Sequence, residues 1–315
     1  MLLTTLAILG CVAASTQSPV VSTGCGKPHT PGYHTVHGNT GKNLSIKSDG
    51  IPRYYTVQVP TEYDAQKKYP LIFDYHGSSN TPLNQRDNSA YYNYTNKYLV
   101  VYPEGRGLNW QGPTYAAGSN DLLFTDDLLA HVAGQYCIDP QHIYASGKSN
   151  GGGFVDTLAC SDVGDKFAAF AMASAALYTD TKLTACPNKK RAILEAHGDK
   201  DSIIPYVPTK DGRGGPLPNV GKWVGWWGQR DCGANAKPTV DIKPTGYNVT
   251  TYSCNGRQDV VKHYHMAKGG HCWPSSDPET SDNRGGSCKG ARVLDFTPKV
   301  LEFFRKWNLK NGPGS

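Results

Sequence analysis

The sequence predicts an α/β fold built on a doubly wound, mostly parallel sheet. Two continuous apolar runs, 69–75 and 99–103, are typical of parallel strands that are covered on both faces. Strand-like and helix-like segments alternate along the chain, as this fold class requires. A third β-prone run, 143–146, leads into Gly147-Lys148-Ser149-Asn150-Gly151, and small residues then open a predicted helix. A serine between glycines at such a junction lies on a strained strand-to-helix turn, so this stretch is also the first indication of function.

Local patterns predict the remaining elements in chain order. Alternating residues at 53–60 indicate an antiparallel strand, and Thr125 is the expected N-cap of a helix whose apolar face includes Leu128 and Val132. Further strands are expected at 167–176, 191–196 and 260–266, and an amphipathic helix at 294–307. Trp223, Trp226 and Trp227 follow a Gly/Pro-rich excursion at helical spacing, and they are better explained as core packing than as a carbohydrate platform.

Composition limits the function classes. The chain has 315 residues, of which 18% are charged, and Gly (35), Pro (21) and Tyr (19) are plentiful, so we expect a loop-rich globular protein. The net charge of +6 is spread along the chain, and its densest run is 189–191. Without a basic stripe or a recognised module, nucleic acid is not an expected partner. One catalytic domain over 15–315, with no accessory carbohydrate-binding module, is the simplest interpretation, and we expect a monomer.

The first residues resemble an export signal. Residues 2–14 are apolar and end in Val12-Ala13-Ala14, which suits signal-peptidase cleavage after position 14. The run is too short to span a bilayer as a stable helix. We therefore expect a secreted, extracellular protein with no membrane partner.

The cysteines agree with export. Removal of Cys11 with the signal would leave eight, an even number that predicts four disulfides. These eight are Cys25, Cys137, Cys160, Cys186, Cys232, Cys254, Cys272 and Cys288. Local pairs of Cys160 with Cys186 and of Cys232 with Cys254 are candidates, and a zinc site is less favoured because no C-x-x-C spacing occurs. Three sequons predict glycans on surface loops at Asn43, Asn93 and Asn248.

Three residues after predicted strands form a candidate catalytic set, Ser149, Asp201 and His271. Their order, Ser then Asp then His, is the order expected of an α/β-hydrolase. Ser149 would be the nucleophile, and His271 the base that accepts its proton and later protonates the leaving alcohol. Asp201 would orient the imidazole and stabilise the imidazolium.

Other residues compete for two of these roles. Asp199 and Asp201 both belong to a turn, where aspartates are common, and the residues alone favour neither as the acid. His197 is a less natural base because it belongs to the same loop as the acid. His263 and His265 fall within a predicted strand, which favours a structural role.

An oxyanion hole needs backbone N–H groups aimed at the developing negative charge. One donor should be the N–H of Asn150, directly after the nucleophile. The other should come from the loop after the strand that ends at Tyr75, from Ser78 or Ser79, between which the sequence does not choose.

Five motifs in order carry a family resemblance. They are His76-Gly77, Asn109-Trp110-Gln111-Gly112, Gly147-Lys148-Ser149-Asn150-Gly151-Gly152-Gly153, His197-Gly198-x-x-Asp201-x-x-x-Pro205-Tyr206 and Gly270-His271-x-Trp273-Pro274. Together they resemble the secreted feruloyl esterases of fungi, in a group shared with acetyl xylan esterases and related to polyhydroxybutyrate depolymerases. The resemblance implies an α/β-hydrolase fold, Asp201 as the acid and no cofactor, and we expect no metal. Trp110 and Trp273 would be pocket walls for an aromatic acyl group or else buried support, and Cys272 could hold the histidine loop through a disulfide.

The leading hypothesis is a serine esterase that releases ferulic or related hydroxycinnamic acids from feruloylated plant cell-wall polysaccharide, such as arabinoxylan. Acetyl xylan esterase and polyester depolymerase are rivals that would use the same catalytic set. A non-catalytic carbohydrate-binding protein on a hydrolase scaffold would need none of these three residues. A secreted peptidase could use the same three residues, but the sequence contains no sign of a peptide-binding exosite, so this function is disfavoured.

Overall fold

The computed structural model describes residues 19–35, 44–116, 118–186, 189–286, 288, 290 and 292–314. The predicted signal peptide, 1–14, and the sequon at Asn43 lie outside these ranges. From residue 19 to residue 31 the chain is irregular, and the first strand begins at Gly32.

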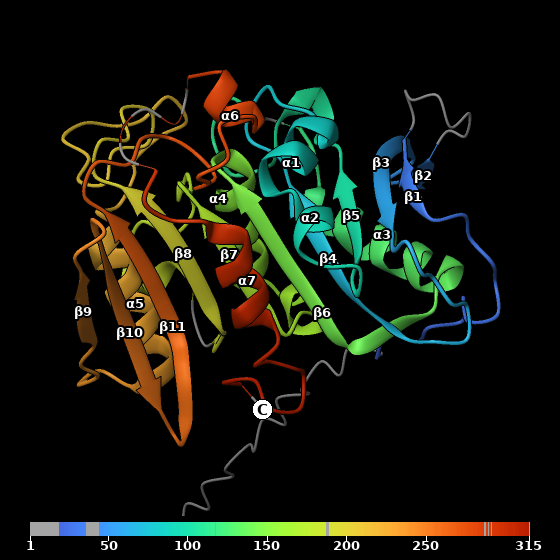
Figure 1. Ribbon diagram of the computed structural model, residues 1–315. Coiled ribbons are helices and arrows are strands. Elements are labelled where there is room, and N and C mark those ends of the chain that lie inside the picture. The colour runs from blue at the N-terminus through green and yellow to red at the C-terminus, as the bar shows by residue number, and fades with distance from the viewer. Residues whose placement is uncertain are drawn as a thin grey trace, which may run out of the picture.

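The described strands form one sheet in the order β1-β3-β5-β4-β6-β7-β8-β11-β10-β9, with β2 paired to β3 (Figure 1). Six neighbouring strands, from β5 to β11, run parallel, and the pairs at both edges are antiparallel. The strands are β1 Gly32–His34, β2 Ser45–Ser48, β3 Ile51–Val59, β4 Tyr69–Tyr75, β5 Leu99–Pro103, β6 Ile138–Lys148, β7 Ala169–Ala173, β8 Ile193–Gly198, β9 Thr239–Lys243, β10 Tyr247–Cys254 and β11 Arg257–Met266. This mostly parallel sheet confirms the predicted α/β fold.

Helices cover both faces of the sheet. The α-helices are α1 Pro82–Ser89, α2 Tyr91–Tyr94, α3 Asp121–Gln135, α4 Asn150–Ala159, α5 Val220–Cys232, α6 Ser281–Arg284 and α7 Phe296–Phe304, and short 3₁₀ turns occur at Arg106–Leu108, Val163–Lys166 and Leu183–Ala185. Helix α7 crosses the front of the sheet in Figure 1, whereas α5 lies behind it. On that rear face the Trp227 indole N–H donates to Asp156, which joins α5 to α4.

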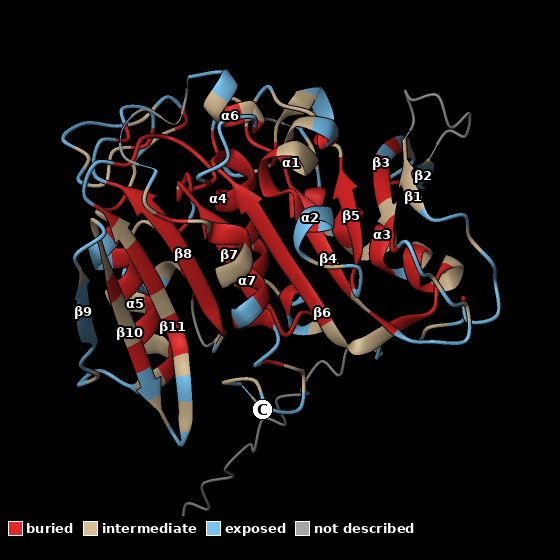
Figure 2. Ribbon diagram, viewed as in Figure 1, coloured by how far each residue is buried: buried red, intermediate tan, exposed pale blue. Residues whose placement is uncertain are grey.

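The central strands are the buried core (Figure 2). Every residue of β5, β7 and β8 is buried, and so is every residue of β4 except Pro70. This confirms that the apolar runs 69–75 and 99–103 mark strands covered on both faces. Trp223 and Trp227 are also fully buried, as predicted for core packing.

The antiparallel edge formed by β9 and β10 was not predicted from the sequence. Strand β9 carries Val240 and Ile242, which are 57% and 75% exposed, so burial does not shape its pattern. The hairpin pairs Tyr247 with Lys243 and extends the sheet beyond β11. A strand without a buried face has a weak hydrophobic signal, which explains why this one was missed.

Helix α3 begins earlier than predicted. Its N-cap is Asn120, whose side-chain oxygen accepts the backbone N–H of Leu123 at 3.1 Å. The predicted cap, Thr125, lies inside the helix, and its buried hydroxyl lies 3.0 Å from the hydroxyl of Tyr75. The prediction of Thr125 as the N-cap was therefore wrong, because the helix begins four residues before it. The Thr125 hydroxyl contacts Tyr75 on the sheet and does not cap the helix.

Four disulfides connect the eight cysteines. They join Cys25 to Cys137, Cys160 to Cys186, Cys232 to Cys254 and Cys272 to Cys288, so both predicted local pairs are confirmed. The first holds the irregular amino-terminal segment against the end of α3, where the N–H groups of Thr23 and Gly24 both donate to the carbonyl of Ala133 at 3.0 Å.

Two sequons lie in regular structure and not in the predicted loops. Asn93 is exposed in the short helix α2, and Asn248 is half-buried in β10, where it pairs with His265.

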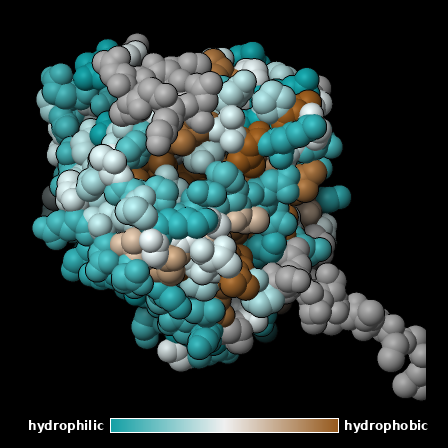
Figure 3. Space-filling view, turned by 90° about the vertical axis from the view of Figure 1, so that its right-hand side faces the viewer, coloured by the Kyte–Doolittle hydropathy of each residue, from teal (hydrophilic) through white to brown (hydrophobic). Residues whose placement is uncertain are grey.

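The face on the β1–β3 side is largely hydrophilic, with apolar residues in separate small patches (Figure 3). Among the described residues, none of the helices is both long enough and apolar enough to cross a membrane.

Glycines allow β4, β6 and α4 to approach closely, and one substitution tests this. A Cβ at Gly151 would lie 2.2 Å from the carbonyl oxygen of Tyr75, so Gly151→Ala should lower the free energy of unfolding by about 3 kcal/mol or more. As a control, the Cβ of Gly225→Ala in α5 would meet only the Tyr252 hydroxyl, at an ordinary 3.7 Å. This control should be neutral or stabilising by up to about 1 kcal/mol. Thermal and urea unfolding of both variants would measure the difference, and equal stabilities would contradict the packing argument.

Candidate active site

Ser149 lies between the end of β6 and the start of α4 in a strained backbone conformation, with φ 56° and ψ −121°. Three backbone hydrogen bonds hold it there. Its N–H donates to the carbonyl of Ala173, and its carbonyl accepts the N–H groups of Gly153 and Ala176, all at 2.9 Å. The turn is therefore fastened to β7 and to the chain that follows β7.

The structure brings the predicted Ser, His and Asp together. His271 Nε2 lies 2.9 Å from Ser149 Oγ, and His271 Nδ1 lies 2.8 Å from Asp201 Oδ2. The other oxygen of Asp201 accepts the backbone N–H groups of Ile203 and Ile204, at 2.9 and 2.8 Å. Asp201 is buried and Asp199 is exposed, so the geometry favours Asp201 as the residue that orients His271.

The charges around His271 favour a neutral base. Burial lowers the pKa of His271, and the nearby Lys148 lowers it further, while Asp201 raises it in part. Burial would raise the pKa of Asp201, but hydrogen bonds from His197 and His271 outweigh burial and hold this pKa well below its usual range. At neutral pH the site therefore contains an ionised Asp201 and a neutral His271 that can accept a proton.

Two backbone N–H groups are suitable donors for an oxyanion. Asn150 is the first residue of α4, where the N–H has no intrahelical acceptor and the helix dipole is positive. Within the described part of the chain, the N–H of Ser78 has no acceptor, whereas the N–H of Ser79 donates to Leu108 at 2.8 Å. Of the two alternatives, the geometry therefore favours Ser78, because the N–H of Ser79 is already used.

The loop that contains Asn109 and Trp110 supports both donors, a role that the sequence did not reveal. Asn109 accepts the Ser78 hydroxyl at 2.6 Å. The side chain of Asn150 accepts the N–H of Trp110 at 2.7 Å and donates to its carbonyl at 3.1 Å. The presence of Asn109-Trp110 among the shared motifs was the available signal.

Neither predicted pocket tryptophan offers surface to a substrate. Trp110 is 0% exposed, stacks on Phe154 and donates its indole N–H to the carbonyl of His76 at 2.9 Å. Trp273 is 1% exposed and donates to Thr297 at 2.9 Å. The prediction that they line the pocket was wrong, and both are buried support.

A buried ion pair and a disulfide fix the histidine loop. Lys148 Nζ lies 2.6 Å from Asp282 Oδ1, and Asp282 also accepts the backbone N–H of Trp273 at 2.8 Å. Cys272, next to His271, is bonded to Cys288. The sequence suggested the clamp through Cys272 but not the ion pair, whose partners are 134 residues apart.

The segment 202–219 connects β8 to α5 and forms part of the loops beyond the carboxyl end of β8 (Figure 1). Its Gly214 carbonyl accepts the N–H of Thr114 at 3.0 Å. Arg213 lies over the ring of Tyr115, 4.8 Å from its centroid. The loop is therefore packed against the 113–116 turn, close in sequence to the loop that supports the oxyanion donors.

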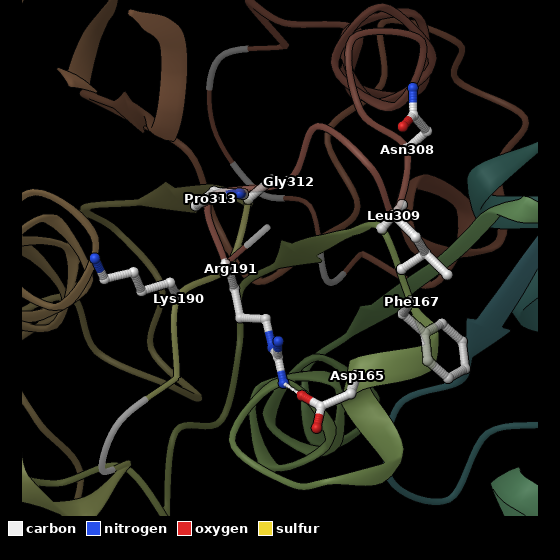
Figure 4. Close-up of a pocket in the computed structure, with 11 residues that line it drawn as sticks. Asp165, Phe167, Lys190, Arg191, Asn308, Leu309, Gly312 and Pro313 are labelled. Atoms are coloured by element: carbon white, nitrogen blue, oxygen red, sulfur yellow. Dashed lines mark hydrogen bonds and ion pairs between the residues drawn. The ribbon is translucent and has the colours of Figure 1, made fainter. Parts of the chain in front are cut away.

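A separate cavity of about 190 Å³ lies at the amino ends of β7 and β8, opposite the strand ends that carry the site (Figure 4). Arg191 is one of the two cationic residues that line it. This side chain donates to Asp165 and to the carbonyl of Ala159, so its charge is used internally. The cavity has no part in the site around Ser149.

One acidic cluster has a metal-like arrangement, but its ligands have other partners. Asp156, Cys160 and Asp180 lie close together. Cys160 is in a disulfide, and Arg230 binds both oxygens of Asp180 at 2.6 Å. The cluster is explained as structural.

No protein-family model matches the chain, but similar proteins were found. Feruloyl esterase D of Neurospora crassa is 30% identical over 218 residues, which cover 64% of this chain and 68% of that protein. The chain belongs to the feruloyl esterase family. Probable feruloyl esterase C of Aspergillus flavus is 25% identical to this esterase, over 76% of the chain and 84% of the relative.

Solved structures agree on the fold of this esterase. An acetyl xylan esterase from Aspergillus awamori matches with a TM-score of 0.58 and 13% identity, over 84% of the chain and 100% of that structure. The feruloyl esterase module from Clostridium thermocellum, complexed with sinapinate, matches with a TM-score of 0.50 and 14% identity, over 81% and 88%. At these identities the similarity establishes the fold of esterases and nothing finer.

The disulfide next to His271 provides a test of loop positioning. Replacing both Cys272 and Cys288 with Ala should lower the free energy of unfolding by about 3 kcal/mol and should also reduce kcat, because the His271 loop is freed. Replacing Cys232 and Cys254, which close a loop of similar length away from the site, should cost about the same stability but leave kcat unchanged. Urea unfolding and ester hydrolysis measure the two effects. Equal kcat values in both variants would refute a positioning role for the first disulfide.

Proposed function

We propose that this protein is a secreted serine esterase that releases ferulic or related hydroxycinnamic acids from plant cell-wall polysaccharide such as arabinoxylan. The observation that carries the proposal is the hydrogen-bonded chain Ser149–His271–Asp201, together with the N–H groups of Asn150 and Ser78, which have no acceptor among the described residues. Membership of the feruloyl esterase family supports the substrate class. The apolar run at 2–14 and the four disulfides support export, since disulfides persist in oxidising compartments.

The geometry supports a two-step mechanism. Ser149 Oγ attacks the ester carbonyl carbon while its proton passes to His271 Nε2. The N–H groups of Asn150 and Ser78 stabilise the oxyanion, and collapse of the tetrahedral intermediate breaks the bond to the sugar oxygen, which takes the proton from His271. A water molecule then attacks the acyl-enzyme and gives a proton to His271. The bond between the acyl carbon and Ser149 Oγ breaks, Oγ takes that proton back from His271, and the acid leaves.

Acetyl xylan esterase and polyester depolymerase are competing functions on the same catalytic set. They differ in the acyl pocket, because a hydroxycinnamate needs a long, flat, apolar slot and acetate needs a small one. Assays of the purified protein on methyl ferulate, methyl caffeate, 4-nitrophenyl acetate and polyhydroxybutyrate decide among them. Turnover of the acetate ester alone would refute the proposed acyl group.

Two substitutions test the catalytic assignments. Ser149→Ala should lower kcat by about 10⁶, and Asp201→Asn by roughly 10⁴, because the nucleophile and the residue that orients the base are lost. Asp199→Asn is the matched control, since Asp199 is exposed in the same turn, and its kcat should be unchanged. Initial rates on methyl ferulate provide the measurement. Full activity of Ser149→Ala, or equal losses in the two aspartate variants, would overturn the assignments.

The pH dependence should follow His271. The base must be neutral to accept a proton, and burial lowers its pKa below the ordinary 6.5. We therefore expect kcat/KM to be constant at neutral pH and to fall only as the pH drops through a value below 6.5. A profile whose acid limb lies above 6.5 would contradict this electrostatic description.

A further inference from the structure

A buried group of ionisable side chains lies directly behind Asp201. Glu195 and His197 on β8 are 0% exposed, and His263 on the neighbouring strand β11 is 2% exposed. His197 Nδ1 lies 3.0 Å from Glu195 Oε1. The second oxygen of Glu195 lies 2.7 Å from His263 Nδ1, an ion-pair distance without hydrogen-bond geometry. The proposed mechanism uses none of these three residues.

The partners of His197 determine its protonation state. Its Nδ1 faces the Glu195 carboxylate, and its Nε2 faces the carbonyl of Ile204 at 2.8 Å and Asp201 Oδ2 at 3.4 Å. All three partner atoms are acceptors when the carboxylates are ionised. A neutral imidazole has only one N–H, so it would point a lone pair at one of these oxygens. Only the doubly protonated ring donates on both sides.

The charges agree with a buried imidazolium. Burial alone would lower the pKa of His197, but Glu195 and Asp201 outweigh it and raise the pKa to about 10. Burial would likewise raise the pKa of Glu195, but His197 and His263 hold it below its usual range. Glu195 and Asp201 thus each keep a negative charge, and the cation lies between them.

We propose that His197 is a positioning residue, held as an imidazolium between Glu195 and Asp201, and that its charge limits how strongly Asp201 raises the basicity of His271. The inference rests on the proposed roles of Ser149, Asp201 and His271. It adds two buried residues, His197 and Glu195, to the three proposed catalytic residues. The contacts then run from Ser149 through His271, Asp201 and His197 to Glu195. His197 itself does not act as the base, because both of its nitrogens are occupied by these acceptors.

A purely structural role for this cluster is the competing explanation. The ionisable groups that face or neighbour His197 are Glu195, Asp201, Tyr206, His263, His265 and His271. Either explanation predicts lower stability when His197 is replaced. Only the proposed role predicts a change in the pKa that governs catalysis, so the pH profile separates the two.

The sign of the change follows from the charges. With the imidazolium present, part of the field of Asp201 is compensated, and the protonated form of His271 is less stabilised. Without it, Asp201 attracts the proton on His271 more strongly, so the pKa of His271 rises. The acid limb of kcat/KM then moves to higher pH.

The decisive variant is His197→Gln, which keeps a polar side chain but carries no charge. Its acid limb should move up by roughly one pH unit, the lower end of the effect of a nearby charge, because Asp201 lies between the two histidines. His142→Gln is the matched control, because it breaks a His–Asp contact of 2.7 Å with Asp139 at the surface and should leave the profile unchanged. An unshifted limb in His197→Gln would overturn the proposal.

A measurement on the unmodified enzyme does not depend on the folding of any variant. Nuclear magnetic resonance of ¹⁵N-histidine-labelled protein at pH 8 should show protons on both ring nitrogens of His197, and on one nitrogen of His271. A single protonated nitrogen on His197 would refute the imidazolium. The same spectrum of Ser149→Ala reports on His197 without turnover, so failure of the proposed function and failure of this inference give different results.

Discussion

The strained backbone of Ser149 is the constraint on which the rest of the site depends. A non-glycine residue at φ 56° costs of order 1–3 kcal/mol, and it persists only where its surroundings determine it completely. Here the surroundings are backbone atoms. A Cβ at Gly147 or Gly153 would lie 2.7 or 2.0 Å from main-chain atoms of the neighbouring segments, so β6, α4 and the chain after β7 approach as closely as their main chains allow. Ser149, the proposed nucleophile, is thereby fixed relative to the buried parallel strands, and His271 and Asp201 are hydrogen-bonded in sequence to that fixed point.

Buried charged groups lie on two sides of His271. On one side the buried pair of Lys148 and Asp282 lies within electrostatic range, and on the other Asp201 is backed by His197 and Glu195. Each buried charge has an opposite neighbour, which is the condition for keeping ions inside a protein. The net result is that His271 stays neutral at neutral pH while Asp201 stays ionised.

Features that depend on local pattern were predictable from the sequence, and features that depend on distant partners were not. The apolar strands at 69–75 and 99–103, the order of Ser149, Asp201 and His271, and the short-range disulfides all have local signals. Thr125 was misjudged because the better cap, Asn120, precedes it by five residues, and β9 was missed because its apolar residues are exposed. The choice between Ser78 and Ser79 depends on a hydrogen bond to Leu108, and the burial of Trp110 and Trp273 depends on packing across the sheet. No spacing rule contains that information.

The loop at 202–219 has a consequence for how such an enzyme can diversify. Its first residues belong to the site, because the N–H groups of Ile203 and Ile204 donate to Asp201 and the carbonyl of Ile204 faces His197. From residue 207 to residue 218, by contrast, the loop contacts the 113–116 turn and Tyr178. Insertions, deletions and substitutions within 207–218 therefore alter the surroundings of the reaction without disturbing the contacts that hold Ser149 and Asp201. The architecture separates a part that tolerates almost no sequence change from a part that is free to vary, so new substrate preferences can be reached by loop replacement on an unchanged catalytic frame.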